Sequence, residues 1–336
     1  MRRFPALALT LCALLFAAPV QAKKVTIKLG TMAPDGSTWH NLLKQMGEEW
    51  SKASNGEVKL KIYPGGVAGN EGDMARKLRV GQLQAAALSV VGLHDIETSP
   101  QAIATPGLIL DDAEWDHVFA KMKPLWQPRF EAKGFVPIMW GDTGWVYLFV
   151  KKPVTKASDL PGTKVFAWAG DPESVKAWQA AGYQPVVISS TDILPSLTTG
   201  MIEGFATTPI MAFTARWYEQ TTHMIAASWG HLPGATVILK DTWEKIPEEL
   251  RPKLLAIAAD YGEKVNKEVQ RMQAESIAEM KKKGLTVVEF SPGEKAAFVK
   301  MAEKTWPLVR GGICTAEAFD EVKSIRDAYR ASKAKQ

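Results

Sequence analysis

The chain has 336 residues and a formal net charge of +5, a balance that gives no support to a nucleic-acid-binding surface. Single domains usually hold about 100 to 200 residues, so this length fits two of them. We therefore expect two lobes, each with its own core, and no nucleic-acid partner.

The first residues have the pattern of a secretory signal peptide. Arg2 and Arg3 precede an apolar run over 7–18, and Val20-Gln21-Ala22 has the small residues of a signal peptidase site. We expect cleavage after Ala22, which removes residues 1–22 and leaves a periplasmic protein. Cleavage lowers Lys+Arg from 41 to 39 against 36 Asp+Glu, which gives a net charge of +3.

Neither cysteine is expected to carry a modification. Cys12 lies inside the signal peptide, and Leu11 before it is too large for lipoprotein processing. Cys314 is the one cysteine left after cleavage, so an internal disulfide is impossible, and we expect an inert thiol. No other apolar run approaches the ~20 residues that a membrane helix needs.

Strands and helices alternate along the first part of the mature chain. Val25, Ile27 and Leu29 alternate with polar residues, which predicts a strand, and Ser37 then caps a helix. A second strand is predicted over 58–62, a helix over 70–80, and a strand of small residues that ends at Ser89. This rhythm predicts a mainly parallel sheet flanked by helices, an α/β fold.

The segment 159–209 predicts two further strand–helix units whose strand ends are apolar. A strand over 163–168 contains Phe166 and ends at Trp168, a helix over 172–181 stops before Gly182, and a second strand spans 185–188. In an open α/β sheet, ligands bind outside the carboxyl ends of the strands. Apolar residues at such an end favour binding over catalysis.

One long helix is predicted over 247–283, where apolar or small residues recur every three or four positions. It would span about 54 Å at the rise of an α-helix. That length exceeds the width of one small domain, so we expect this helix to brace both lobes.

The sequence lacks the motifs of the common enzyme classes, including Gly-x-Ser-x-Gly, His-Glu-x-x-His, Cys-x-x-Cys and Gly-x-Gly-x-x-Gly. The five histidines have no metal-ligand spacing, so neither a metal nor another cofactor is expected. The acidic run from Asp111 to Asp116 lacks the glycine and glutamate of a calcium loop. It favours a helix N-terminus instead.

The aromatic side chains favour a binding site. The chain has twelve tryptophans, and such large side chains must either pack in the core or line a pocket. Most are expected in the core. Others lie at the ends of elements, where loops face crevices and binding residues concentrate. Core packing is the alternative for each of these, but their joint placement favours a pocket. The candidates are Trp39, Trp145, Phe166, Trp168, Phe205 and Trp229.

Short segments spread over roughly residues 25 to 325 carry a resemblance to one family. They are Ile27-Lys28-Leu29-Gly30, Tyr63-Pro64-Gly65-Gly66, Val80-Gly81-Gln82-Leu83, Asp159-Leu160-Pro161-Gly162-Thr163-Lys164-Val165, Ile202-Glu203-Gly204 and Val287-Val288-Glu289-Phe290-Ser291. In this order they resemble the DctP-like solute-binding subunits of TRAP transporters. The resemblance implies a two-lobed, periplasmic-binding-protein-like fold with a brace helix, and transient contact with the TRAP membrane subunits.

The resemblance also implies where a carboxylate would bind. The family's strand after the Asp-Leu-x-Gly turn normally carries an arginine that pairs with the substrate carboxylate, and Phe166 occupies that position here. A second family arginine is matched by Val146, and the family's asparagine is replaced by Thr207 and Thr208 before Pro209. Neither phenylalanine nor valine can imitate the bidentate contact of an arginine with a carboxylate.

We therefore predict a receptor for a neutral or largely apolar ligand. The aromatic candidates would supply contact area, and Ser89, Thr207 and Thr208 would supply hydrogen bonds. An organic acid stays open as an alternative if Arg216, Lys77 or a bound metal replaces the missing arginines. A periplasmic enzyme with Asp142 or Glu203 as general base, and a carrier or chemoreceptor partner without transport, are the further alternatives.

The resemblance and the strand pattern together predict how the lobes divide. Lobe I is expected over 23–145 plus about 232–272, and lobe II over 146–231 plus about 273–336. The hinge is expected near 142–150 and again near 229–237. A ligand would close the lobes through contacts that exist only in the closed state.

Overall fold

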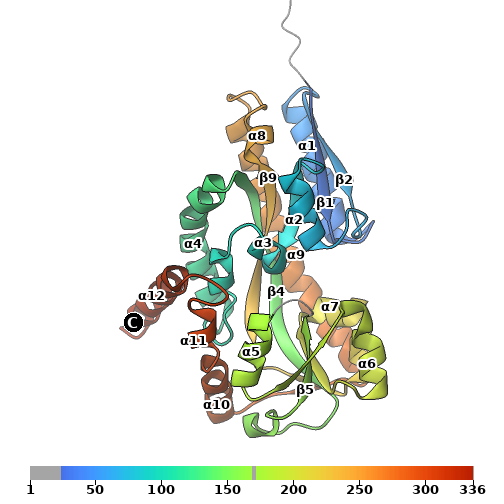
Figure 1. The fold of residues 1–336 in the computed structure, drawn as a ribbon, viewed down its shortest axis with the longest axis vertical. Coiled ribbons are helices and arrows are strands. Elements are labelled where there is room, and N and C mark those ends of the chain that lie inside the picture. The colour runs from blue at the N-terminus through green and yellow to red at the C-terminus, as the bar shows by residue number, and fades with distance from the viewer. Residues whose placement is uncertain (1–23, 169–171, 336) are drawn as a thin grey trace, which may run out of the picture.

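The computed structural model describes residues 24–168 and 172–335, so the expected signal peptide lies outside the described residues. Two long strands run through the middle of the molecule, where β4 (Phe135–Val150) pairs antiparallel with β9 (Gly230–Leu239). Together with the helix α9 (Arg251–Lys282), they connect two bodies, which we call lobe I and lobe II (Figure 1).

Lobe I contains the first three strands, the first half of β4 and the second half of β9. Its sheet has the order β2-β1-β3-β9-β4, with the first three strands parallel to one another. Its elements are β1 (Val25–Thr31), α1 (Thr38–Ala53), β2 (Val58–Tyr63), α2 (Glu71–Arg79), β3 (Ala85–Ser89), α3 (Val90–His94), η1 (Ser99–Ala102), α4 (Asp112–Ala132) and α8 (Lys240–Trp243).

Lobe II contains the second half of β4. In its sheet, β7 lies beside β4, β5 beside β7, and β6 beside β5. The pair β8 and β10 lies off this path, with β8 bonded to β4. The elements are β5 (Lys164–Trp168), α5 (Pro172–Ala180), β6 (Gln184–Ile188), α6 (Ile193–Thr199), β7 (Gly204–Thr207), α7 (Pro209–Thr214), β8 (His223–Ile225), β10 (Thr286–Val288), α10 (Pro292–Glu303) and α11 (Trp306–Val309), with the 3-10 turns η2 (Ala157–Asp159), η3 (Ser190–Asp192) and η4 (Trp217–Gln220).

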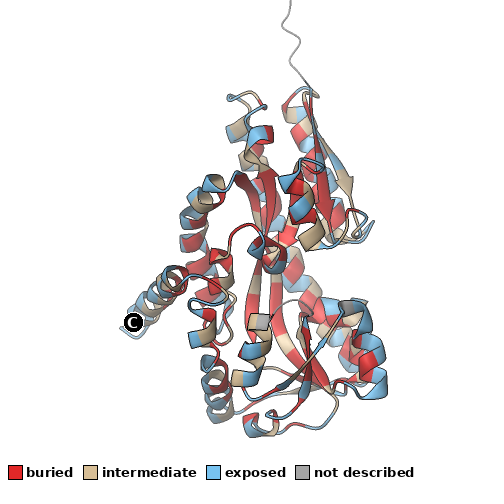
Figure 2. Cartoon of the chain, viewed as in Figure 1, coloured by how far each residue is buried: buried red, intermediate tan, exposed pale blue. Residues whose placement is uncertain are grey.

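The buried residues follow the central strands and the helix faces that cover them (Figure 2). Lobe I has one apolar cluster under α4 and another under α1 and α9, and lobe II has its own clusters around Phe298 and around Phe205. The structure is therefore α/β with a core in each lobe, as the sequence predicts.

Local sequence signals place most element boundaries correctly. The Ser37 side chain accepts a hydrogen bond from the His40 N–H at 3.3 Å and so caps α1. Gly182 lies just past α5 with φ of 94°, a conformation that favours glycine. The long helix begins at Arg251 rather than at the predicted Pro247, because Pro252 occupies its first turn, where a missing N–H costs nothing.

The central pair β4 and β9 is the main feature that the sequence did not predict. The predicted sheet is mainly parallel, whereas β9 runs antiparallel to both β3 and β4. β4 is buried along almost its whole length, so it has no polar alternation by which a strand is recognised. The expected hinge segments lie on these two strands.

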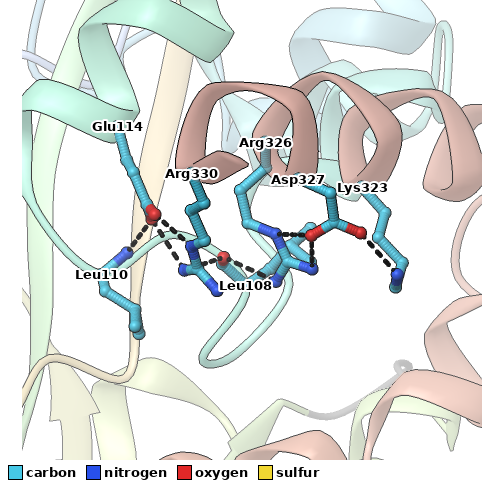
Figure 3. Close-up of polar contacts among 7 residues, drawn as sticks. All are labelled: Leu108, Leu110, Glu114, Lys323, Arg326, Asp327 and Arg330. Atoms are coloured by element: carbon cyan, nitrogen blue, oxygen red, sulfur yellow. Dashed lines mark hydrogen bonds and ion pairs between the residues drawn. The ribbon is translucent and has the colours of Figure 1, made fainter. Parts of the chain in front are cut away.

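The C-terminal helix α12 (Ala316–Lys333) packs on lobe I, although the expected division assigned its residues to lobe II. Figure 3 shows Arg330 bonded to the carboxylate of Glu114 in α4, and Arg326 donating to the Leu108 carbonyl at 3.2 Å. Phe319 and Val322 join the apolar cluster under α4. The apolar face of α12 explains this packing, because it is buried against the apolar residues of α4.

Candidate ligand-binding site

The strand directions make the carboxyl ends of the two lobes' sheets face each other. Because β3 and β4 are both antiparallel to β9, β1, β2 and β3 run in the direction of β4, toward lobe II. β7 is antiparallel to β4, β5 is parallel to β7, and β6 is parallel to β5. These three strands therefore run toward lobe I. Ligands bind at such ends in open α/β sheets.

Strand register locates the space between these ends. Ser89, the last residue of β3, pairs with Gly234, which pairs with Gly141. Thr207, the last residue of β7, pairs with Tyr147. Residues 142–146 of β4 and 230–233 of β9 therefore lie between the two sets of strand ends. We call these residues the interlobe floor.

Large apolar side chains are exposed beside the facing strand ends. Met32 follows β1, Val91 follows β3, Trp168 ends β5, Val187 lies near the end of β6, and Met211 follows β7. Their exposed fractions are 46%, 52%, 44%, 51% and 48% in that order. The apolar area that stays exposed at these strand ends is available for contact with a ligand.

The structure brings Phe166 and Trp168 together at the end of β5. Their rings meet edge to face, with centroids 5.0 Å apart and planes at 69°. Phe166 is buried at 6% exposure in the core of lobe II, whereas Trp168 projects into solvent. This strand end therefore offers an aromatic edge where the resemblance places an arginine.

Other aromatic candidates and Val146 lie within the core of lobe II. Val146 and Trp229 belong to one buried cluster, in which Trp229 stacks on Trp178 with centroids 4.8 Å apart. Phe205 has no exposed surface and stacks on Phe149 at 5.0 Å. Core packing, the alternative to pocket lining, thus describes these side chains in this conformation.

The predicted hydroxyl donors are mostly engaged in local structure. Ser89 Oγ donates to Glu71 Oε2 at 2.6 Å, and Thr208 Oγ1 accepts from the Met211 N–H at 3.3 Å as the cap of α7. Thr207 pairs through its backbone with Tyr147 on β4. Thr207 and Thr208 thus lie at the facing strand ends, and their contact with a ligand stays a prediction.

Trp39 lies at the start of α1 and packs near elements of both lobes. It is half-buried against the cluster formed by Ile210 of α7 with Val265 and Val269 of α9. Ile210 follows β7, so this cluster connects lobe I to the strand end of lobe II. Trp39 is therefore near the interlobe space but also part of an interlobe contact.

Trp145 lies on the interlobe floor within a polar and aromatic cluster. Its indole Nε1–H donates to Asp112 Oδ1 at 2.6 Å. Its ring centroid lies 4.3 Å from that of His231 in a tilted arrangement, and the His231 ring stacks on Trp115 with centroids 3.8 Å apart. His231 Nε2 lies 2.5 Å from Asp142 Oδ1, and both side chains are almost fully buried.

A β-bulge brings Asp142 and His231 together. The register of β4 against β9 shifts between Asp142 and Gly144, which leaves Thr143 as the extra residue. Gly144 has φ of 103°, and its N–H donates to Asp142 Oδ1 at 2.6 Å. In a regular strand, residues 142 and 145 would point to opposite faces, so the bulge is what turns Asp142 to the face of Trp145.

Sequence reasoning missed His231, Trp115, Asp112 and Tyr147. The histidine is separated from Asp142 by 89 positions and belongs to no local motif, so only the pairing of β4 with β9 connects them. Tyr147 packs against clusters of both lobes. Its position two residues after Trp145, on the same face of one strand, was the available signal.

The electrostatic surroundings of the interlobe floor are acidic. Burial, with the nearby charges of Asp112 and Asp142, raises the pKa of Asp116. Burial also raises the pKa of Tyr147 to about 12, and the charges of Asp112 and Glu289 add to this shift. Such surroundings disfavour a further carboxylate.

The two cations considered as replacements for the missing arginines are engaged elsewhere. Arg216 donates from Nε to Glu219 Oε1 at 2.9 Å on the surface of lobe II. Lys77 donates from Nζ to the Ala68 carbonyl at 2.7 Å. A carboxylate ligand would have to draw either cation away from its partner.

A surface hollow and the buried thiol of Cys314 lie apart from this site. A shallow hollow between α1 and α9 is lined by Thr38, Asn41, Leu42, Gln45, Lys264, Lys267 and Glu268, and includes none of the predicted ligand-binding residues. Cys314 is 3% exposed, and burial raises the pKa of its thiol to about 12, as expected for an inert cysteine.

Two absences hold for residues 24–168 and 172–335. Within these ranges, no three or more His, Cys, Asp or Glu side chains are grouped so as to hold a metal ion. None of the helices there combines the length and apolar character needed to span a bilayer.

Comparison with known proteins assigns the chain to a family. Residues 29–310 match the family of bacterial extracellular solute-binding proteins, family 7, also called DctP, and the chain belongs to this family. It is 24% identical over 296 residues to the C4-dicarboxylate-binding periplasmic protein DctP of Rhodobacter capsulatus, with 86% of this chain and 87% of the relative covered.

Solved structures show the same two-lobed fold. A TRAP periplasmic solute-binding protein of Ochrobactrum anthropi, with its C-terminus bound in the ligand-binding pocket, matches with a TM-score of 0.83 at 21% identity, covering 94% of this chain and 98% of that one. A TRAP protein of Desulfovibrio salexigens with bound orotic acid matches with a TM-score of 0.80 at 18% identity, covering 92% and 99%.

Proposed function

We propose that this protein is the periplasmic receptor of a TRAP-type transporter and captures a small neutral or largely apolar ligand between its lobes. The observation that carries the proposal is the set of exposed apolar side chains at the facing strand ends, among them Trp168 at 44% and Met211 at 48% exposure. Covering such surface with a ligand is favourable by about 25 cal/mol per Å² of apolar area.

The positions at which the resemblance places arginines support the same ligand class. Phe166 and Val146 are 6% and 7% exposed and belong to apolar clusters, so neither supplies a charge. Asp112 and Asp116 add negative charge near the interlobe floor. A ligand carboxylate buried here would lack a partner, and that burial is costly.

An organic acid is the second candidate, because similar proteins are described with acidic ligands. The Rhodobacter capsulatus relative is named for a C4-dicarboxylate, and the Desulfovibrio salexigens structure contains orotic acid. For this chain to bind such a ligand, Arg216 would have to leave Glu219, or Lys77 would have to leave the Ala68 carbonyl.

Closure and delivery complete the proposed function. Ligand contacts with both lobes would favour the closed state, with bending in 142–150 and 229–237. The closed receptor would then dock transiently on the TRAP membrane subunits. No catalytic step is part of the proposal; Asp142 accepts a hydrogen bond from the Gly144 N–H and Glu203 accepts one from the Lys164 N–H.

Export through a signal peptide is part of the proposal. Arg2, Arg3 and the apolar run that follows support cleavage after Ala22. N-terminal sequencing of the protein recovered from the periplasm should then begin at Lys23. A protein that retains Met1, or one that begins at a lipid-modified Cys12, would contradict this part of the proposal.

Titration calorimetry on mature protein freed of bound ligand tests the ligand class. Succinate and orotate represent the organic acids, and 1-decanol represents an apolar neutral ligand. We expect binding of the neutral probe and no measurable heat from either acid. Tight binding of succinate or orotate with no binding of the neutral probe would establish the second candidate instead.

A further inference from the structure

Little of the two central strands is open to a ligand. β4 and β9 are buried along most of their length (Figure 2). Over 142–147 of β4 and 230–233 of β9, the residues that stay partly exposed are Thr143, Tyr147 and Leu232. A ligand that reaches the interlobe floor therefore meets these strands mainly through those three residues.

Tyr147 carries a polar group that the fold does not use. Its hydroxyl has no hydrogen-bond partner among the residues that the structure describes, and its oxygen, unlike that of Tyr183, is not fully buried. The Thr143 hydroxyl, in contrast, already donates to the Leu232 carbonyl at 2.9 Å. The accessible side chains of these strand segments thus offer a ligand one unengaged hydrogen-bonding group, the phenol of Tyr147.

This hydroxyl lies at the boundary of the two lobes. Tyr147 pairs with Thr207, the last residue of β7, at the carboxyl end of the lobe II sheet. Its ring packs against the apolar cluster under α4 in lobe I and against the cluster around Phe205 in lobe II. The charges of Asp112 in lobe I and Glu289 in lobe II both act on it. The phenol thus borders the space in which the ligand is proposed to lie.

The surroundings of Tyr147 keep its hydroxyl protonated. Burial of the ring, together with the negative charges of Asp112 and Glu289, raises the pKa of Tyr147 to about 12. At neutral pH the side chain therefore has one O–H to donate. The same two carboxylates make an anionic ligand group beside it unfavourable.

We propose that Tyr147 determines ligand specificity by donating a hydrogen bond from its hydroxyl to an acceptor oxygen on an otherwise apolar, neutral ligand. This inference rests on the proposed function and refines its ligand class to molecules with a carbonyl, ether or hydroxyl oxygen. A hydrocarbon of the same size would displace water from the O–H without replacing its hydrogen bond, which is unfavourable.

The test measures how Tyr147→Phe changes the affinity for 2-octanone and for 1-octene, on the mature full-length protein freed of bound ligand. The variant keeps the ring and removes only the hydroxyl, and the two probes have equally many carbons but only the ketone has an acceptor. We expect the affinity for 2-octanone to fall by about three- to tenfold. The affinity for 1-octene should not fall. Calorimetry gives the dissociation constants.

Tyr183→Phe is the matched control for this variant. The Tyr183 hydroxyl also lacks a partner, but it is buried in lobe II, and the residue precedes β6 at the amino end of that strand. Its loss should leave the affinities for both probes unchanged. Both variants should be at least as stable to heat as the wild type, because neither lost hydroxyl bonds to a described residue.

The infrared carbonyl stretch of bound 2-octanone gives a second measurement that needs no variant. A hydrogen bond to a carbonyl oxygen weakens the C=O bond and lowers the frequency of this stretch. In the wild type we expect the stretch of the bound ketone below its value in hexane. In Tyr147→Phe it should lie near the hexane value.

Each outcome of these measurements has a defined meaning. An unchanged affinity of Tyr147→Phe for 2-octanone, an equal loss for both probes, or a hexane-like carbonyl stretch in the wild type would overturn the inference and leave the proposed function intact. Binding of octanoate without binding of 2-octanone or 1-octene, or no binding of any of the three, would contradict the proposed function and the inference together.

Discussion

The ring of Phe166 lies edge-on against Trp168 at the carboxyl end of β5, with centroids 5.0 Å apart and planes at 69°. One member of the pair is buried at 6% exposure and the other is 44% exposed. The buried ring thus anchors the exposed one, and the strand end presents apolar rather than charged surface to the opposite lobe.

Trp168→Ala should weaken ligand binding with little effect on folding. The side chain is 44% exposed, so its removal leaves no cavity, but the ligand loses a large apolar contact. We expect affinity to fall by about 10- to 100-fold, as for central aromatic contacts in other binding sites. Calorimetry measures the affinity, and thermal unfolding of the free protein checks the fold.

Met201→Ala is the matched control for this variant. Met201 is also exposed, at 53%, but it precedes β7 and so lies at the amino end of that strand. Its removal should leave affinity unchanged. Equal losses for Trp168→Ala and Met201→Ala would show that the strand end is not the binding surface.

Phe166→Arg should exchange stability for affinity toward organic acids. The new guanidinium would enter an apolar cluster at a position that is 6% exposed, and we expect the free energy of unfolding to fall by roughly 2–4 kcal/mol. Succinate should partly restore stability by pairing with it. Urea unfolding with and without succinate measures both effects.

Phe166→Leu serves as the control, because it alters packing without adding charge. Its unfolding midpoint should not respond to succinate. If the wild type and the leucine variant were stabilised by succinate as strongly as the arginine variant, position 166 would have no part in excluding acids.

Asp142→Ala should be strongly destabilising. His231 and Asp142 are 2% and 3% exposed, and removing one partner of a buried hydrogen-bonded pair costs about 3–5 kcal/mol. Glu219→Ala removes the partner of Arg216 in an exposed pair, where solvent screens the attraction, so little change in stability is expected. Chemical denaturation compares the two, and a similar small loss for both would mean that the floor does not depend on the buried pair.

Asp116→Asn should stabilise the protein at neutral pH. Burial and the charges of Asp112 and Asp142 raise the pKa of Asp116 above its ordinary value of 3.8 in the folded state. The folded protein then binds this proton more tightly than the unfolded chain, so the ionised side chain lowers stability as the pH rises through the raised pKa. The variant should therefore have a higher urea midpoint than the wild type at pH 7.

The advantage of Asp116→Asn should shrink as the pH falls toward 4, where the wild-type carboxyl takes up its proton. Asp260→Asn, on the exposed face of α9, should have no such pH-dependent gain. A wild type that is the more stable of the two at pH 7 would reverse the sign of the argument.

Much of the fold could be predicted from the sequence because its signals are local. The Ser37 cap, the glycine at 182 and the spacing along α9 each specify structure within a few residues. The resemblance to DctP-like proteins supplied the two-lobed arrangement. The strands β4 and β9, which run through both lobes, could not be predicted in this way. Buried strands have no polar alternation, so only their pairing with other strands identifies them.

The candidate site was only partly predictable for the same reason. Phe166 and Trp168 lie at a strand end that local pattern reveals, and the structure places them side by side. Phe205 looks similar in sequence but stacks on Phe149 in the core, a contact between residues 56 positions apart in the chain. The pairing of Asp142 with His231 depends on a bulge at Thr143, which no sequence motif marks.

Mass spectrometry of the ligand released from protein purified from its own periplasm, without added ligand, tests the central claim most directly. We predict that the released compound is a neutral, largely apolar molecule, present in about equimolar amount. Release of a dicarboxylate, a sugar acid or another organic anion at that stoichiometry would contradict the account.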